Sequence, residues 1–511
     1  MKAKVVFKTY DQSQLSLLPP SYDDLVPAHH PVRIVNTIID QIDISALERS
    51  YKGGGTSSYH PRMLLKVIIY AYLRNMYSSR KIEQALQENI HFMWLSGQCK
   101  PDHNTINDFR GKRLKGKFKN IFNQVVLLLA DQGVLSLKEL FVDGTKIEAN
   151  ANRFTFVWGK SIKNSKERIK KQLRELWSYV EKVYDQEQML PNTPDFDAID
   201  PAEVAKTIDA INDALKDKKI DKKVKQKLHY AKKNWPANLK KYQEQEAIIG
   251  KRNSYSKTDP DATFMRMKDD YMQNGQLKPG YNLQASSNNQ FITNYTLAQT
   301  TADTTTLKNH LQDHIDSFNQ TPETLTADAG YGSEENYSDL EQKGVTAFVK
   351  YNYFHKEQRD KKHQENPFHP DNLFYNEETD TYYCPMGQAM QKVKSYKSKT
   401  KNGFIQKVDR YQAQNCQGCP LRGSCHKSKG NRIIERNHNL IRLKQKAKTL
   451  LLSEAGIAHR KRRCWDIEAI FGNIKQNMGF KRFMLRGMDK VTTEIGLIAM
   501  AHNLKKFTLV Q

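Results

Sequence analysis

The order of strand-like and helix-like segments between residues 140 and 350 constrains the fold of this chain most. The segments follow as strand, helical insert, two strands, helix, strand, helix and strand, at 140–149, 159–250, 281–286, 291–297, 304–318, 324–328, 333–342 and 346–350. The two consecutive strands flank Ser287-Asn-Asn-Gln, a hairpin signal. Strands that alternate with helices in this way predict an α/β sheet.

Apolar residues at helical spacing predict that the first 130 residues are all-α, with helices at 32–47, 61–76, 79–88, 105–113 and 116–132. Ser78 and Asp102 stand where capping residues begin two of them. The helix at 105–113 carries Arg110, Lys112 and Arg113, which favours a helix-turn-helix that contacts DNA. A structural bundle with a basic last helix is the alternative.

We expect five parts along the chain. Apolar residues at 162–183 and 204–215 predict a charged helical hairpin, the segment after 351 is polar and irregular with clustered cysteines, and the last 75 residues are helical. The parts are an N-terminal DNA-binding domain, a split α/β core, the hairpin insertion, the cysteine-bearing insertion and C-terminal helices that complete the core: 1–135, 136–158 with 251–351, 159–250, 352–437 and 438–511.

The chain is strongly basic, with 81 Lys and Arg against 56 Asp and Glu and a formal net charge of +25. A surplus of this size favours a polyanionic partner, above all nucleic acid, since each neutralised phosphate releases counterions. A basic surface kept for solubility is the alternative. The longest apolar runs are too short to span a bilayer, and the N-terminal residues lack the apolar segment of a secretory signal, so we expect a cytoplasmic protein with no membrane partner.

Four of the six cysteines cluster in the 352–437 segment: Cys384, Cys416, Cys419 and Cys425. Tetrahedral Zn²⁺ is bound by four soft ligands, and a CxxC turn places two sulfurs on one ion. We therefore predict a zinc site, which is structural because four protein ligands leave no position open for chemistry. His426 could replace one thiol, and reduced cysteines in a flexible insert are the alternative.

Three carboxylates stand at positions where an α/β fold could bring them together. Asp143 lies inside the first apolar run, Asp328 follows the strand at 324–327, and Glu468 lies beside the apolar stripe of a C-terminal helix. Oxygen ligands suit Mg²⁺, and a pair of such ions can activate the attacking oxygen and stabilise the leaving oxygen at phosphorus. A turn or capping role is the alternative for an Asp at a strand end.

Four stretches carry a family resemblance: Tyr59-His-Pro-Arg through Pro101-Asp-His-Asn-Thr-Ile-Asn-Asp-Phe-Arg, Phe141-Val-Asp-Gly-Thr-Lys-Ile-Glu-Ala-Asn, Ala327-Asp-Ala-Gly-Tyr-Gly-Ser, and Ile467-Glu-Ala-Ile-Phe-Gly-Asn-Ile-Lys. They resemble a bacterial insertion-sequence transposase of the DDE type, whose catalytic core has the RNase H-like fold shared with retroviral integrases. The resemblance implies that Asp143, Asp328 and Glu468 bind Mg²⁺ or Mn²⁺, as a pair of ions. It also implies cleavage of transposon ends, transfer of the 3′-hydroxyls to target DNA, double-stranded DNA as partner, a homodimer or larger assembly, and a place at the bacterial nucleoid.

The last motif adds DNA contacts. Lys475 lies two helical turns after Glu468, so the two side chains share one side of a helix, and Arg482 and Arg486 are further candidates to hold phosphates. Related groups carry Tyr and Arg seven and four residues before the Glu. This chain has Lys461 and Cys464 there, with Arg462 and Arg463 beside them, so the signature is met in part.

Two other functions fit the same residues. A transposase-derived protein could bind DNA without catalysis, although the presence of all three carboxylates argues against it. An RNase H-like nuclease would hydrolyse DNA without strand transfer, since both reactions use the same groups. Detection of joined product separates the nuclease from the transposase.

Overall fold

The structure is a computed structural model, and it describes residues 21–51, 57–183, 200–218, 220–267, 276–359, 365–400 and 402–510. The N-terminal residues on which the expected lack of a secretory signal rests lie outside this part of the chain. The described residues divide into two compact units. One extends to Leu128 and resumes at Thr493, and the other extends from Leu129 to Thr492. No helix among the described residues is both long enough and apolar enough to cross a membrane.

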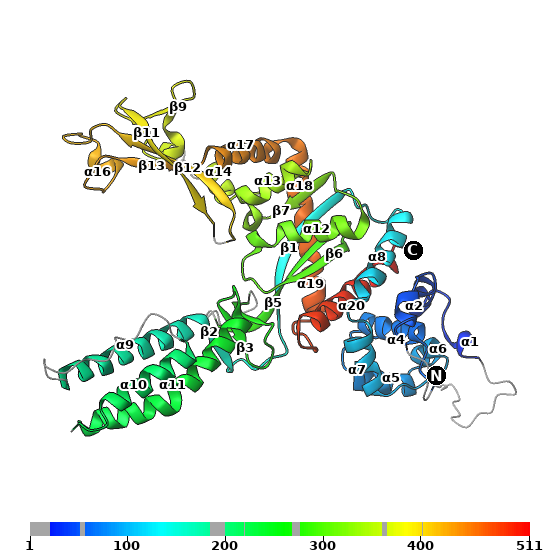
Figure 1. The fold of residues 1–511 in the computed structure, drawn as a ribbon. Helices are drawn as coiled ribbons and strands as arrows, with labels where there is room; N and C mark the ends of the chain where they lie inside the picture. The colour runs from blue at the N-terminus through cyan, green and yellow to red at the C-terminus, as the bar shows by residue number, and fades with distance from the viewer. Residues whose placement is uncertain are drawn as a thin grey trace, which may run out of the picture. The chain divides into compact units, whose positions relative to one another are not determined.

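The first unit is helical, as expected (Figure 1). Its helices, with the two that continue past the unit boundaries, are α1 (Tyr22–Leu25), α2 (Pro31–Asp40), α3 (Ser45–Glu48), α4 (Pro61–Leu73), α5 (Ser79–Glu88), α6 (Ile90–Ser96), α7 (His103–Asp108), the π turn η1 (Phe109–Arg113), α8 (Phe118–Asp131) and α20 (Met488–Phe507). The helix expected at 32–47 is two helices, and the one expected at 105–113 is α7 with a π turn. Asp102 caps α7 by accepting a hydrogen bond from the Thr105 amide at 2.8 Å.

The second unit is built on a mixed sheet, whose six described strands are β1 (Glu139–Glu148), β4 (Thr263–Arg266), β5 (Leu277–Asn288), β6 (Phe291–Ala298), β7 (Thr324–Ala327) and β8 (Thr346–Val349). Its order is β4-β5-β1-β7-β8, with β6 paired to β5. β1 is antiparallel to β5 and parallel to β7, and β7 is parallel to β8. The expected succession of elements is therefore confirmed.

Local sequence explains the hairpin between β5 and β6. Asn289 and Gln290 adopt φ values of +53° and +63°, which is the left-handed conformation that the favoured two-residue hairpin turns require. The parallel strands are covered by the helices η2 (Asp303–Thr305), α12 (Leu307–Phe318), η3 (Ala329–Tyr331), α13 (Glu334–Gln342) and α17 (His438–Leu452). Leu140 and Val142 of β1 pack with apolar residues of α12, α13 and α17 in one buried cluster. This core fixes β1 and β7 side by side.

The helical insertion differs from the expected hairpin. It follows β2 (Phe156–Trp158) and contains α9 (Gly159–Val183), α10 (Pro201–Ala214) and α11 (Lys222–Ile249), and it precedes β3 (Ser254–Ser256), which pairs with β2. Trp235 and Leu239 of α11 are buried in one cluster with α9 and α10. The expected two-helix hairpin thus contains a third packed helix, α11 (Figure 1).

The cysteine-bearing insertion is not irregular, contrary to expectation. It follows α14 (Phe354–Arg359), and its described residues include the 3₁₀ turn η4 (Pro370–Asn372), the short helix α16 (Arg422–Cys425) and a five-stranded antiparallel sheet in the order β13-β12-β11-β10-β9. The strands are β9 (Phe374–Asn376), β10 (Thr381–Tyr383), β11 (Ala389–Lys399), β12 (Ile405–Ala413) and β13 (Ile433–Arg436). Sequence patterns did not predict this sheet, because most of β11 is exposed and lacks the apolar alternation of a half-buried strand.

Candidate active site

Asp143 and Asp328 are neighbours because β1 and β7 are parallel and in register. Val142 pairs with Ala327, and each Asp is the next residue of its strand. The Asp143 carboxylate accepts a hydrogen bond from the Gly144 amide at 2.8 Å, and Asp328 accepts one from the Ala329 amide at 2.5 Å as the cap of η3. The expectation that these two strand residues come together is confirmed.

Glu468 reaches the same place from the C-terminal helical run. This run consists of α18 (Glu454–Arg463), the π turn η5 (Cys464–Glu468), α19 (Ala469–Gly472) and the π turn η6 (Asn473–Asn477). Its apolar stripe, Ile467, Ile470, Phe471 and Ile474, is buried. A cavity of about 340 Å³ is lined by Asp143, Thr145, Asp328, Arg463, Glu468, Phe471, Gly472, Lys475 and Gln476. The three expected carboxylates therefore share one pocket.

Arg463 lies between the three carboxylates. Its guanidinium is 3.2 Å from Asp143 Oδ2, 3.8 Å from Asp328 Oδ2 and 2.8 Å from Glu468 Oε1. The Arg463 side chain is 6% exposed, whereas Asp328 and Glu468 are about half exposed. Burial alone would lower the pKa of Arg463, but the three carboxylates outweigh it and raise the pKa above its ordinary value. Arg463 is thus a permanent cation at the centre of the pocket.

The π turn explains why sequence spacing missed Arg463. In a π turn the backbone bonds run from residue i to i+5, so residues five apart meet where an α-helix brings together residues four apart. Arg463 stands five residues before Glu468 and donates to it across η5. Cys464, at the expected spacing of four, is exposed. The sequence did point to it indirectly, because Arg463 stands one residue further from Glu468 than the Arg of related groups.

A polar cluster supports Asp143 from the other face of β1. Gly144 pairs with Gln284 of β5, whose amide nitrogen donates to Asp303 at 3.1 Å and whose oxygen accepts from the Tyr331 hydroxyl. A Cβ at Gly144 would lie 2.5 Å from the Gln284 amide nitrogen and 2.8 Å from Asp303 Oδ1. Burial, then the carboxylates of Asp143 and Asp303, raise the pKa of Tyr331, so this phenol stays protonated. The close packing explains a glycine directly after the first Asp.

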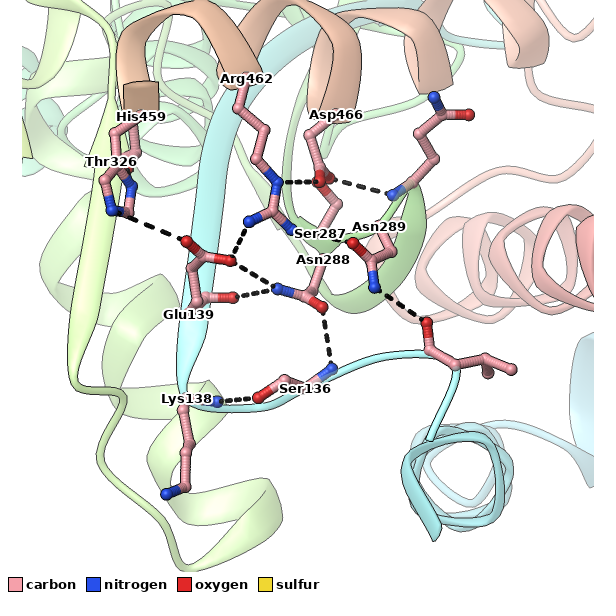
Figure 2. Close-up of polar contacts among 12 residues, drawn as sticks. Ser136, Lys138, Glu139, Ser287, Asn288, Asn289, Thr326, His459, Arg462 and Asp466 are labelled. Atoms are coloured by element: carbon pink, nitrogen blue, oxygen red, sulfur yellow. Dashed lines mark hydrogen bonds and ion pairs between the residues drawn. The ribbon is translucent and has the colours of Figure 1, made fainter. Parts of the chain in front are cut away.

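A second polar network holds the opposite side of the helical run that carries Arg463 and Glu468 (Figure 2). Arg462 pairs with Glu139, at the start of β1, at 2.5 Å and donates to Asn289 at 2.9 Å. Asp466 is fully buried and accepts from the Ser287 hydroxyl at 2.6 Å and the Gln290 amide at 3.1 Å. The helix therefore touches β1 and the β5–β6 turn through Arg462 and Asp466, while Arg463 and Glu468 face the pocket.

The expected DNA-contacting residues occupy different environments. Lys475 lines the carboxylate pocket, as expected from its spacing to Glu468. Arg482 and Arg486 are exposed, yet each donates to backbone carbonyls in the segment 149–151 after β1. This pairing ties the chain after η6 to the end of β1.

Arg110, expected to contact DNA, is buried. It is 3% exposed and donates to the Tyr72 hydroxyl at 3.0 Å and the Tyr77 carbonyl at 2.6 Å, so it braces the helical unit. Lys112 and Arg113 line a surface groove with Tyr59 and Asn104. Lys112 pairs with Asp108 at 2.8 Å, and Arg113 stacks over Tyr51 at 4.6 Å.

The four clustered cysteines line one cavity of about 330 Å³, together with His426. The Arg432 amide donates to Cys416 Sγ at 3.3 Å, and its guanidinium lies 3.0 Å from Cys425 Sγ. In the part of the chain that the structure describes, no three His, Cys, Asp or Glu side chains lie close enough together to hold a metal ion, and this holds for the cysteines as for the three carboxylates around Arg463. The sulfurs therefore share a cavity without converging on one point, so their type suits zinc and their placement does not.

Fold and site together define a mixed α/β protein whose central parallel strands end in an acidic pocket. Residues 383–508 match the family model described as Transposase DDE domain, and residues 20–112 match the model described as Transposase domain (DUF772). Glu468 lies inside the first match, and Asp143 and Asp328 lie outside both. No curated protein and no solved structure matches the chain.

The chain therefore contains a DDE transposase domain and a DUF772 transposase domain. A DDE transposase domain implies an RNase H-like core, a catalytic function, the use of divalent metal ions and binding to DNA. The sheet order, with its antiparallel strands on one side of β1 and parallel strands on the other, agrees with that implication.

Proposed function

We propose that this transposase binds the terminal repeats of an insertion sequence, cleaves at their ends and joins the freed 3′-hydroxyls to target DNA. The observation that carries the proposal is the pocket in which Asp143, Asp328 and Glu468 surround one buried arginine. The expected domain boundaries, and end recognition by the N-terminal helices through Lys112 and Arg113, are parts of the same proposal, as is a homodimer or larger assembly.

The carboxylates would hold the divalent ions that the domain implies. Carboxylate oxygen is the ligand type that Mg²⁺ and Mn²⁺ prefer, and the three acidic side chains outnumber the two basic ones, Arg463 and Lys475, that line the pocket. Such ions, when bound, lower the pKa of water and stabilise charge on the oxygens around phosphorus. Because Arg463 now contacts all three carboxylates, an ion and this guanidinium compete for the same oxygens.

The chemistry consists of two displacements at phosphorus. In cleavage, water adds to the scissile phosphorus, the bond to the 3′-oxygen breaks, and that oxygen takes up a proton. In joining, the 3′-hydroxyl loses its proton and attacks a target phosphate, whose bond to its own 3′-oxygen breaks. Lys475 and Arg463 are placed to neutralise the phosphate oxygens beside the carboxylates, because both line the pocket.

The test incubates the purified protein with a labelled fragment that carries the ends of its own element and Mg²⁺. We expect end cleavage and joined product on a denaturing gel, both lost with EDTA. Asp143→Asn, Asp328→Asn and Glu468→Gln should each lower the rate by at least about 10³-fold. Asp316→Asn, which removes an exposed carboxylate of α12, is the matched control. Cleavage without joining would identify a nuclease, and binding without cleavage a DNA-binding protein.

The zinc site stays a prediction, since the cysteine sulfurs share a cavity but do not converge. Elemental analysis of the purified protein checks it. One equivalent of zinc that is lost on substitution of both Cys416 and Cys419 by Ser would support the prediction. A protein that is folded and free of zinc would show that the cysteines are reduced thiols.

A further inference from the structure

The β11–β12 hairpin extends beyond the sheet that contains it. β10 pairs with β11 through Ala389 and Met390, and β13 pairs with β12 from Asp409 onward. The outer half, residues 396–399 and 405–408, pairs within itself (Figure 1). We name this outer half the ribbon. It is a two-stranded element with no third strand beside it among the described residues.

The two faces of the ribbon differ. Residues two apart on a strand, and partners directly across two strands, point to the same face. Tyr396, Gln406 and Val408 on one face are half-buried. On the other face the side chains are exposed, and three of them are lysines: Lys397, Lys399 and Lys407. We name these three residues the lysine face.

No ion pair within the described residues neutralises the positive charge of the lysine face, although Lys407 acts electrostatically on Asp409. Lys397 lies directly opposite Lys407, and like charges in such a pair destabilise a sheet. No ion pair or hydrogen bond of these three lysine side chains occurs within the described part of the chain. At the base of the hairpin, by contrast, Lys392 pairs with Asp380 and Asp409 at 3.1 and 2.9 Å. The charge is neutralised at the base and left open further out.

The ribbon is tied to the start of α13, the helix that follows the turn after Asp328. Gln406, on the face opposite the lysines, donates to Glu334 at 2.8 Å. Glu334 is 5% exposed and also accepts hydrogen bonds from Asn437 and Asn439. It is the first residue of α13 and follows Asp328 by six residues, through the turn that carries this carboxylate. The hydrogen bonds at Glu334 therefore hold the ribbon, with its lysine face turned away from α13, against the helix that follows the Asp328 turn.

We infer that the lysine face binds the phosphate backbone of the DNA that enters the active site. The inference rests on the proposed function. A cationic two-stranded ribbon matches the charge of duplex DNA, and each lysine that neutralises a phosphate releases counterions. Phosphates between Lys397 and Lys407 would also remove the repulsion that this pair has in the free protein. The side chains recognise backbone and no particular base, because lysine on phosphate carries no sequence information.

The first experiment measures the affinity of the full chain for a duplex of its element's end as a function of salt. Substitution of Lys397, Lys399 and Lys407 by Gln should reduce the slope of log K against log [salt] by about 2–3, at about 0.9 per lost phosphate contact. The matched control replaces Lys160, Lys163 and Lys171, exposed residues of α9, by Gln and removes the same charge. Its slope should stay within about 1 of the wild type.

An unchanged slope in the ribbon variant, or an equal loss in both variants, would overturn the inference while wild-type cleavage upheld the proposed function. A wild-type protein that neither binds nor cleaves the ends would overturn the proposed function itself. A second measurement needs no variant. Duplex DNA should protect Lys397, Lys399 and Lys407 of the wild type from an amine-reactive reagent several-fold more than Lys160. Equal modification with and without DNA would contradict the assignment.

Discussion

Arg463 donates a hydrogen bond of 2.8 Å to Glu468 across a π turn, and the two residues are five apart in the chain. The hydrogen bond fixes the buried Arg463 side chain and the half-exposed Glu468 side chain relative to each other. It also links the helix to both strand carboxylates, since the same guanidinium contacts Asp143 and Asp328. The helical run 454–477 is thereby joined to β1 and to the residue that follows β7 by charge as well as by packing.

We expect Arg463→Gln to lower the free energy of unfolding by about 1–3 kcal/mol without metal, because the variant leaves three carboxylates without their shared cation. Mg²⁺ should then raise its melting temperature more than that of the wild type, since the ion no longer competes with a guanidinium. Thermal unfolding with Mg²⁺ and with EDTA measures both effects. Arg442→Gln, at an exposed pair with Glu341, should show neither. Equal Mg²⁺ shifts in wild type and Arg463→Gln would refute the competition.

Gly144→Ala should destabilise the second unit by about 1–3 kcal/mol, because its Cβ would press on Gln284 and Asp303 behind the first catalytic Asp. Gly472→Ala is the control. It lies in a helix that lines the pocket, its Cβ would meet nothing within 4 Å, and it should be neutral or stabilising by about 0.5–1 kcal/mol. Denaturant unfolding of both variants measures the two changes in the free energy of unfolding. A neutral Gly144→Ala would mean that the polar cluster adjusts without cost.

Arg110→Gln should lower the stability of the helical unit by about 1–3 kcal/mol, because it removes buried bonds to Tyr72 and Tyr77. Lys112→Gln, at an exposed ion pair, should change stability by less than about 1 kcal/mol. For DNA binding we expect the opposite ranking of the two variants. The salt slope should fall for Lys112→Gln and stay constant for Arg110→Gln at temperatures where that variant is folded. A reduced salt slope for folded Arg110→Gln would support a contact between Arg110 and DNA.

His459 should make the protein less stable in mild acid. Burial lowers the pKa of its imidazole below the ordinary 6.5, and Glu139 offsets this in part. The unfolded chain therefore binds the proton more readily, so stability is complete above pH 6.5 and falls as the pH drops from 6.5 toward the lowered pKa. His459→Phe retains a ring between Phe141 and Phe348 and should lose part of this fall.

Urea unfolding at pH 7.5, 6.5 and 5.5 measures the effect of His459. Replacing the exposed His229 by Gln is the control and should keep the wild-type dependence on pH. The same dependence in His459→Phe would show that other buried histidines account for the acid sensitivity, for example His438, whose pKa burial also lowers.

Much of the core could be predicted because its signals are local. Asn289 readily adopts the left-handed conformation of its turn, and the register of β1 with β7 carries Asp143 and Asp328 side by side. The sequence did not predict the five-stranded sheet because most of β11 is exposed and its residues are polar, so hydrophobic alternation, the main strand signal, is missing there. Arg463 escaped because one extra residue in a helical turn leaves no mark in the sequence pattern.

The sequence by itself predicted the succession of core strands and helices, because residue types and short-range periodicity encode it, and its resemblance to a family implied the class of protein and the three carboxylates. Tertiary structure decided which basic residues serve which role. Arg110 braces a helical unit, Arg463 enters the carboxylate pocket, and the lysine face turns outward. A positive charge has the same appearance in any sequence, and the partners and burial that set its role come from residues far away in the chain.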